Sequence, residues 1–256
     1  MRTYFFSIFS LCLLLVLLAF RVDDKITVYI IGDSTAANKT ANVYPETGWG
    51  MALASFFKGN SVVVDNRALN GKSTASFRAA KDSKTGVITD NWQPVLSHLV
   101  PGDYVFIEFG HNDEKVEKPG VGTSLAEFAA NLSRYVNEAR SRKAIPVLLT
   151  PIVRRNFQSG VLTDTHGGYP GVVRRVADSL HVPLIDMQLK TEKLLTGLGD
   201  TASVKLFNYV PAGHKNYPQG NKDDTHLSPE GAKQIAGLVA QGIAELKLPL
   251  IKFLAK

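Results

Sequence analysis

Short apolar runs alternate with longer segments of helical periodicity along most of this chain. Five of the runs are nearly continuous in Val, Ile, Leu and Phe, which is typical of strands covered on both faces in a parallel sheet. These runs are Ile26–Ile31, Ser61–Asn66, Tyr104–Phe109, Ile145–Leu149 and Pro183–Ile185. The pattern therefore predicts five buried parallel strands.

The segments between these runs carry apolar residues at helical spacing. They predict helices over Gly48–Phe57, Asn91–Leu99, Ser124–Lys143, Val172–Leu180 and Pro229–Leu246. In the longest helix, one apolar stripe is formed by Leu125, Phe128, Leu132, Tyr135, Val136 and Ala139. Alternating strands and helices with short connections predict an α/β fold in three layers, α/β/α, around a flavodoxin-like five-stranded parallel sheet.

The first twenty residues differ from the rest of the chain. Arg2 precedes a segment that is apolar from Leu11 to Phe20, and polar residues follow from Arg21. This arrangement indicates an export signal, and with it a secreted or periplasmic location. An uncleaved membrane anchor is the stronger alternative, because no A-x-A cleavage site precedes Arg21, and an internal core helix is the weaker one. We expect residues 21–256 to form a single domain.

Composition narrows the classes of function. A content of 45% hydrophobic and 20% charged residues is that of an ordered globular protein. The net charge of +6 comes from scattered basic residues rather than a basic stripe, so we expect no nucleic-acid partner; the charge favours an acidic polymer or is simply solvated. The single cysteine, Cys12, lies in the N-terminal segment, and no metal-ligand spacing such as H-E-x-x-H occurs. Neither a metal nor another cofactor is expected.

A serine follows the first predicted strand, in the turn Gly32-Asp33-Ser34, and an acid precedes a histidine by three residues in Asp223-Asp224-Thr225-His226. A serine hydroxyl becomes a strong nucleophile only when an imidazole takes its proton and a carboxylate orients that imidazole. The residues therefore suggest Ser34 as nucleophile, His226 as base and Asp223 as its orienting acid. Asp224 is the competing acid, and Ser34 alone also fits a helix cap.

Two further predicted strand ends carry candidate donors for an oxyanion. Gly71 follows the second strand, where it brings a bare backbone N–H close to a ligand or serves only as a turn. The third strand is followed by Gly110-His111-Asn112-Asp113, and the Asn112 amide offers two N–H groups. We interpret His111 as a structural residue rather than a base. His166, in a glycine-rich loop, is interpreted as a surface residue, with a place in the lining of a site as the alternative.

These segments, in this order along the chain, resemble the four conserved blocks of the SGNH (GDSL-type) hydrolases, and within that group they look most like the rhamnogalacturonan acetylesterases. The resemblance implies that Ser34, His226 and Asp223 form the catalytic set. It further implies an oxyanion hole made by the backbone amides of Ser34 and Gly71 and the side chain of Asn112. The implied substrate is an acetylated polysaccharide, with the rhamnogalacturonan backbone of pectin as the leading candidate.

Three other functions stay open on the sequence alone. One is an acetylesterase for xylan or another glycan, and another is a lipase or thioesterase of the same superfamily, although Phe207–Asp223 is more polar and aromatic than an acyl channel. A non-catalytic glycan-binding protein is the third, and it gives no reason for the complete set of site residues. Phe207–Asp223 and Asn156–Pro170 are predicted long loops, either substrate walls or solvated excursions. The sequence predicts no oligomeric state.

Overall fold

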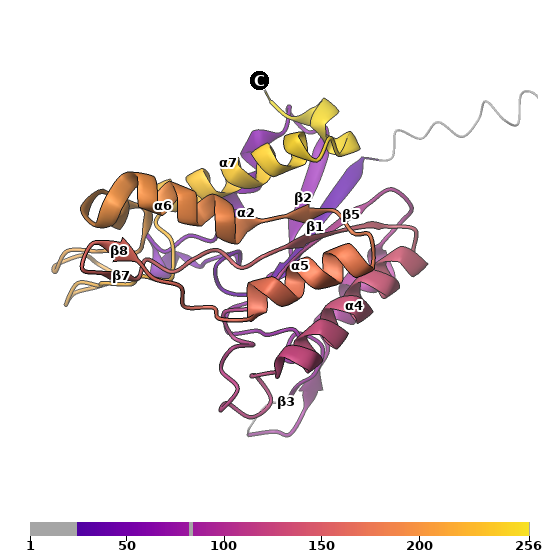
Figure 1. Cartoon of the computed structure of the whole chain (residues 1–256), viewed down its shortest axis with the longest axis horizontal. Coiled ribbons are helices and arrows are strands. Elements are labelled where there is room, and N and C mark those ends of the chain that lie inside the picture. The colour runs from indigo at the N-terminus through magenta and orange to yellow at the C-terminus, as the bar shows by residue number, and fades with distance from the viewer. Residues whose placement is uncertain (1–24, 82–83, 256) are drawn as a thin grey trace, which may run out of the picture.

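The central sheet has five parallel strands in the order β2-β1-β5-β6-β9 (Figure 1). The computed structural model describes residues 25–81 and 84–255, so the expected export signal over residues 1–20 lies outside it. The strands are β1 (Ile26–Gly32), β2 (Val62–Asn66), β5 (Tyr104–Glu108), β6 (Ile145–Leu149) and β9 (Leu184–Ile185). All five predicted strands are confirmed, as is the flavodoxin-like order. The expectation that all five are buried is wrong for β2, which lies at the edge of the sheet and leaves Val63 44% exposed.

Helices cover both faces of the sheet, as predicted. Val28 and Ile30 of β1 pack into a core with the helices α2 (Trp49–Ala52), α6 (Met187–Ser203) and α7 (Pro229–Glu245). Tyr29 and Ile31 point to the opposite face and its helices α3 (Trp92–His98), α4 (Leu125–Ser141) and α5 (Tyr169–Ser179). Figure 1 shows α6 and α7 above the sheet and α4 and α5 below it. Alternate residues of one strand thus supply two separate cores.

The helices follow the apolar pattern with some local differences. Ser124 and Glu127 form a capping box that starts α4, and the predicted stripe is buried except for Leu125, which is 42% exposed in the first turn. The segment predicted as one helix from Gly48 is split into α2 and the 3-10 turn η2 (Leu53–Phe56). The helix α6 was not predicted, because Gly197 and Gly199 weaken its pattern; Gly199, with φ of 75°, interrupts it.

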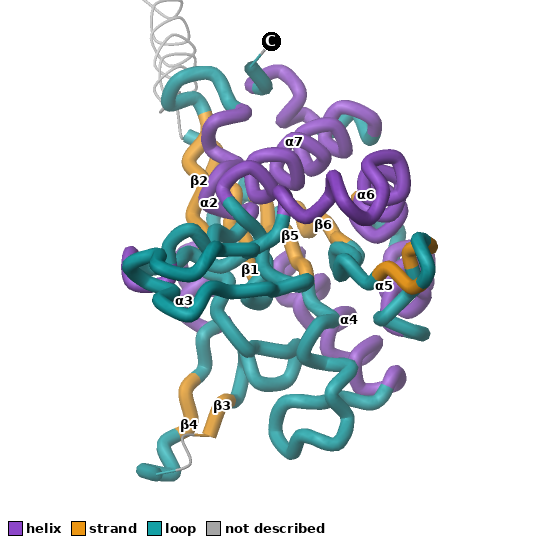
Figure 2. Tube along the Cα trace, turned by 90° about the vertical axis from the view of Figure 1, so that its left-hand side faces the viewer, coloured by secondary structure: helices purple, strands orange, loops and turns teal. Residues whose placement is uncertain are grey.

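Short strands and 3-10 turns lie outside the central sheet and its helices. Two antiparallel pairs join β3 (Ala80–Lys81) to β4 (Ile88–Thr89) and β7 (Phe157–Gln158) to β8 (Val161–Leu162), so the predicted 156–170 loop contains a hairpin. The remaining 3-10 turns are η1 (Ala41–Val43), η3 (Val204–Leu206) and η4 (Pro249–Phe253). Figure 2 shows the loops gathered over the carboxyl ends of β1, β5 and β6. Among the described residues, no helix has the length and apolar character needed to cross a membrane.

The strand order reverses between β1 and β5, and this point fixes the place of a ligand site. In such sheets ligands bind outside the carboxyl ends of the strands where the order reverses. Gly32, the last residue of β1, pairs with Glu108, the last residue of β5. A Cβ on residue 32 would lie 2.5 Å from the Glu108 carbonyl oxygen, so glycine is required there. Ser34 and Asn112 follow these two strand ends directly.

Candidate active site

A serine, a histidine and an aspartate from opposite ends of the chain meet at this edge of the sheet. His226 Nε2 lies 2.9 Å from Ser34 Oγ, and His226 Nδ1 lies 2.7 Å from Asp223 Oδ2. The histidine segment is fixed in place because Asn208 N–H donates to the His226 carbonyl at 2.8 Å. A neutral imidazole that donates from Nδ1 to Asp223 has a free lone pair on Nε2 for the serine proton.

The two adjacent acids before His226 have different partners. Asp223 Oδ1 accepts the backbone N–H groups of Thr225 and His226 at 2.8 and 2.9 Å. Burial would raise the pKa of Asp223, but these hydrogen bonds and the one from the His226 ring outweigh it, so the pKa lies below its usual value. Asp224 Oδ1 instead accepts from Arg155 Nη1 at 2.8 Å and from the Tyr209 hydroxyl at 2.7 Å. Asp223 is therefore the acid that contacts the imidazole.

The three candidate oxyanion donors line one cleft. Asn112 Nδ2 donates to the Lys72 carbonyl at 3.0 Å, which leaves its second N–H available, and Asn112 Oδ1 accepts from Lys115 Nζ at 2.8 Å. Within the part of the chain that the structure describes, the backbone N–H groups of Ser34 and Gly71 donate to no acceptor. Gly71 has φ of 72°, a conformation that favours glycine. The donors are thus free for a ligand oxygen.

Asp113, next to Asn112, holds the Gly71 segment against the end of β5. Its carboxylate accepts Thr74 N–H at 3.0 Å and the Thr123 hydroxyl at 2.9 Å, and it also bonds the Thr74 hydroxyl. Burial raises the pKa of Asp113 to about 7, although these hydrogen bonds oppose the shift. Together with the contact of Asn112 to Lys72, this carboxyl fixes the loop after β2 relative to the loop after β5.

Two fully buried carboxyl groups, Asp33 and Glu108, lie in or beside the turn that carries Ser34. Glu108 accepts Trp49 Nε1–H at 2.6 Å, and Asp33 accepts both the N–H and the hydroxyl of Thr35 at 2.9 Å. Burial and repulsion by Asp33 raise the pKa of Glu108 to about 8. Burial opposes ionisation of Asp33 too, yet contact with His111 and the bonds from Thr35 hold the pKa of Asp33 below its usual value. The two pKa values are shifted in opposite directions, so Glu108 holds a proton more readily than Asp33 does.

Two histidines are buried beside Ser34, and one of them, His111, lines the cleft. His111 Nδ1 lies 3.3 Å from Asp33 Oδ2, and burial lowers the pKa of His111 to about 4, which is consistent with the structural role we assigned. The expectation that His166 lies on the surface is wrong: its side chain is buried, with Nδ1 2.8 Å from Glu114 Oε2 and Nε2 2.8 Å from the Ile152 carbonyl. The rings of His166 and His111 pack edge to face at 4.6 Å. The partners of His166 come from other loops, so its own neighbours in sequence gave no signal.

The cleft at Ser34, the candidate catalytic cleft, encloses about 540 Å³ and is lined mainly by residues with polar side chains. Its lining residues are Ser34, Glu46, Asn70, Gly71, His111, Asn112, Lys115, Arg154, Thr225 and His226. The Arg154 charge is balanced by Glu114 and the Glu46 charge by Lys39, whereas Lys115 has no carboxylate partner within residues 25–81 and 84–255. Over those same residues, no group of three or more His, Cys, Asp and Glu side chains is placed to hold a metal.

An α/β sheet that carries a serine, a histidine and an aspartate in contact at its carboxyl edge has an arrangement suited to ester hydrolysis. Residues 30–234 match the GDSL-like Lipase/Acylhydrolase family, and the chain belongs to that family. The expected SGNH (GDSL-type) membership is thereby confirmed, and the chain is a carboxylic ester hydrolase.

Comparison with known proteins gives similar full-length relatives. The chain is 38% identical over 231 residues to a rhamnogalacturonan acetylesterase of Bacillus subtilis, covering 90% of this chain and 94% of the relative. It is 32% identical to a probable rhamnogalacturonan acetylesterase of the same organism, covering 90% and 97%. Among solved structures, the Bacillus subtilis protein YxiM superimposes with a TM-score of 0.72 at 23% identity. That match covers 88% of this chain and 58% of the other, and it shows the shared fold.

Proposed function

We propose that the chain is an acetylesterase that removes O-acetyl groups from the rhamnogalacturonan backbone of pectin. The observation that carries the chemistry is the continuous contact from Ser34 through His226 to Asp223 in a polar cleft. The substrate is supported by the two relatives, which match this chain over 90% of its length and are named for that activity. The cleft lining has no large apolar side chain, which argues against a long acyl chain as substrate.

The proposed reaction begins with the bound acetyl ester against Ser34. Its Oγ attacks the acetyl carbonyl while His226 Nε2 takes the hydroxyl proton. The ionised carboxylate of Asp223 stabilises the imidazolium that forms and keeps its ring oriented. The negative charge that develops on the carbonyl oxygen is bound by the backbone N–H groups of Ser34 and Gly71 and by the second N–H of Asn112.

The second half of the proposed reaction regenerates the enzyme. The tetrahedral intermediate collapses, the bond to the sugar oxygen breaks, and His226 returns its proton to that oxygen. A water molecule then attacks acetyl-Ser34, with His226 again taking a proton, and acetate leaves as Ser34 recovers its hydroxyl. No cofactor enters this scheme.

The proposed location is outside the cytoplasm, secreted or periplasmic. Support comes from the apolar segment Leu11–Phe20 behind Arg2, which has the form of an export signal. An intact polysaccharide that does not cross a cell membrane is also accessible only to an exported enzyme. Release of the mature chain into the medium or periplasm, with a new N-terminus after the apolar segment, is the expected result on expression in a secreting host.

Acetate release from acetylated rhamnogalacturonan, homogalacturonan and xylan, compared side by side, tests the substrate. We expect rhamnogalacturonan to be deacetylated with the highest kcat/KM, and Ser34→Ala to abolish release. Ser55→Ala, which changes an exposed serine outside the cleft, is the matched control and retains activity. Preference for xylan would replace the pectin assignment. Hydrolysis of an aryl acetate alone would leave an ester hydrolase with another natural substrate.

A further inference from the structure

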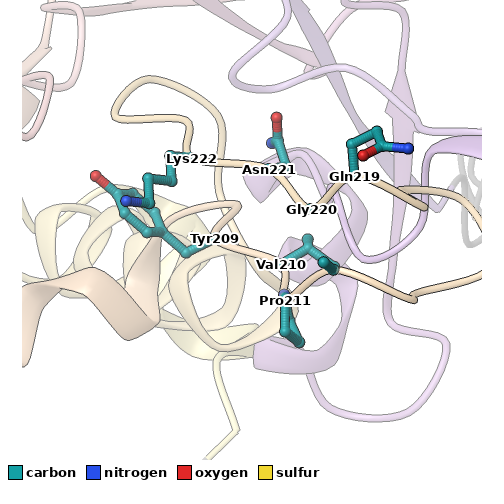
Figure 3. Close-up of a pocket in the computed structure, with 8 residues that line it drawn as sticks. Tyr209, Val210, Pro211, Gln219, Gly220, Asn221 and Lys222 are labelled. Atoms are coloured by element: carbon teal, nitrogen blue, oxygen red, sulfur yellow. The ribbon is translucent and has the colours of Figure 1, made fainter.

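A second cleft, of about 580 Å³, lies on the segment that leads into Asp223 (Figure 3). It is lined by two neighbouring segments, Tyr209–Ala212 and Gln219–Lys222, and none of these residues lines the cleft at Ser34. Lys222 directly precedes Asp223, and Thr225 lines the catalytic cleft two residues further on. The two clefts are therefore neighbours, separated by the turn that carries the two acids.

The two segments that line this second cleft are held in a fixed shape. Val210 and Asn221 join them by two backbone hydrogen bonds, at 2.9 and 2.8 Å, and Asn221 Nδ2 donates to the Asn208 carbonyl at 2.8 Å. Gly220 has φ of 78°, and a Cβ there would lie 2.9 Å from the Val210 carbonyl oxygen. The two segments thus pack against each other as closely as glycine allows. A preformed cleft loses little conformational entropy when it binds a ligand.

Polar groups in the second cleft remain available to a ligand. The side chains of Lys222 and Gln219 are exposed, and neither makes a hydrogen bond or ion pair within residues 25–81 and 84–255. In Figure 3, Lys222 lies at the Tyr209 end of the cleft and Gln219 at the other end. An ammonium group without a carboxylate partner is a binding point for an anion, and an amide binds hydroxyl groups as donor and acceptor.

An aromatic ring and a proline supply the apolar surface of the second cleft. The Tyr209 ring is fixed from outside the cleft, because the Arg155 guanidinium packs over it at 5.4 Å and its hydroxyl contacts Asp224 Oδ1 at 2.7 Å. Pro211 is exposed on the same segment, Tyr209–Ala212. Apolar surface with a few well-placed polar groups is the usual composition of a ligand site. Here the mixture fits a sugar ring, which has C–H faces and hydroxyl edges.

We propose that this second cleft binds a uronate unit of an acidic polysaccharide, at a distance along the polymer from the acetyl group being removed. Lys222 pairs with the sugar carboxylate, Gln219 binds hydroxyl groups, and Tyr209 contacts the ring. The lone ammonium and the net charge of +6 favour an acidic over a neutral glycan. The inference deepens the proposed function and rests on it, since one polymer chain then occupies both clefts and gains affinity from simultaneous contact.

Binding to a full-length Ser34→Ala variant tests the second cleft without turnover. The probe is an unacetylated oligogalacturonate, titrated calorimetrically at low salt, with a neutral galacto-oligosaccharide of equal length for comparison. We expect Lys222→Gln to weaken oligogalacturonate binding on the order of fivefold, the effect of one exposed ion pair, and Lys222→Arg to retain it. The control is Lys215→Gln, an exposed lysine of the same loop that does not line the cleft, and it binds as the parent does.

Three results would overturn the uronate site: no binding of the oligogalacturonate to Ser34→Ala, equal affinity after Lys222→Gln, or equal affinity for the neutral oligosaccharide. The outcome is separable from that of the proposed function. Acetate release by the wild type without oligogalacturonate binding leaves the esterase and removes the second site. Binding that depends on Lys222, without acetate release from any pectin, leaves the second site and removes the assignment as a pectin acetylesterase.

Discussion

Lys115 Nζ lies 2.8 Å from Asn112 Oδ1, so an ammonium group donates to the oxygen of the amide that we place in the oxyanion hole. A positive charge at the oxygen of an amide draws electron density from its nitrogen and makes its N–H groups stronger donors. The Lys72 carbonyl accepts one of these N–H groups at 3.0 Å and thereby fixes the orientation of the amide. Lys115 is thus placed to strengthen the donor that Asn112 offers to the substrate.

Replacing this lysine tests its effect on the chemical step. We expect Lys115→Met to lower kcat on an aryl acetate about tenfold, the loss of one charge-assisted hydrogen bond, with KM little changed. Asn112→Ala is expected to cost on the order of a hundredfold to a thousandfold. In the Asn112→Ala background, Lys115→Met should cost nothing further, because no amide remains to polarise. An undiminished tenfold loss in that background would show that Lys115 acts on the substrate directly.

Substitutions of the adjacent acids Asp223 and Asp224 should have different effects, the first on kcat and the second on stability. An amide at position 223 has only one oxygen, so it cannot accept both the backbone N–H groups and the ring N–H of His226. It also carries no charge to stabilise the imidazolium. Asp223→Asn is therefore expected to lower kcat on the order of a thousandfold to ten thousandfold. Asp224→Asn weakens contacts to Arg155 and Tyr209, and should lower the midpoint of thermal unfolding while costing less than about tenfold in kcat. Equal losses of kcat in the two variants would contradict the assignment of Asp223.

Much of the fold was predictable from the sequence because it depends on local apolar patterns and on the order of the strands along the chain. The sheet strands are mainly apolar runs, and parallel strands bring their carboxyl ends to one edge, so Ser34 and Asn112 were expected there. The contact of Asp223 with His226 follows from a spacing of three residues. Such features depend on neighbours in sequence or on a rule of topology, and the structure places these residues together.

The features that were missed depend on contacts between distant segments. Glu108 lies at the end of a buried strand, yet its role depends on Trp49 and Asp33, which come from other parts of the chain. His166 is buried by partners on two other loops. A lone charged residue in an otherwise apolar strand was the one available signal, and it marks Glu108 as a residue to test.

The positive φ of Gly71 should matter for catalysis as well as for stability. A Cβ at this position meets nothing within 4 Å, so Gly71→Ala introduces backbone strain without a clash. The cost in stability is about 1 to 2 kcal/mol if the conformation is kept. Relief of that strain by rotation of the backbone would move the N–H that we assign to the oxyanion, so kcat should fall at least about tenfold.

A second glycine provides the control for this variant. Gly59 has φ of 50°, nothing within 4 Å of a Cβ, and a position before β2, away from the carboxyl edge of the sheet. Gly59→Ala should lower the free energy of unfolding by a similar amount and leave kcat unchanged. Chemical denaturation and initial rates on an aryl acetate measure both quantities. Normal turnover by Gly71→Ala would remove this N–H from the oxyanion hole.

Glu108 should make the fold less stable as the pH rises. Its pKa is about 8 in the folded chain, above the ordinary value of about 4.3 expected after unfolding. Between these values the folded chain keeps a proton that the unfolded chain has lost, so the free energy of unfolding falls with rising pH and levels off above about pH 8. Asp113 acts in the same direction, since its pKa is raised to about 7. Asp33 acts in the opposite direction at acid pH, because its pKa is lowered.

A neutral amide at position 108 removes this titration and so measures the contribution of Glu108 to the pH dependence of stability. Glu108→Gln keeps an oxygen for Trp49 Nε1–H and carries no charge at any pH. The difference in the free energy of unfolding between about pH 5 and about pH 9, measured by urea denaturation, should shrink by at least about 1 kcal/mol relative to the wild type. Glu117→Gln changes an exposed glutamate and should leave that difference as it is. If Glu108→Gln also leaves it unchanged, Glu108 is ionised in the folded chain at neutral pH and the proton of the acid pair lies elsewhere.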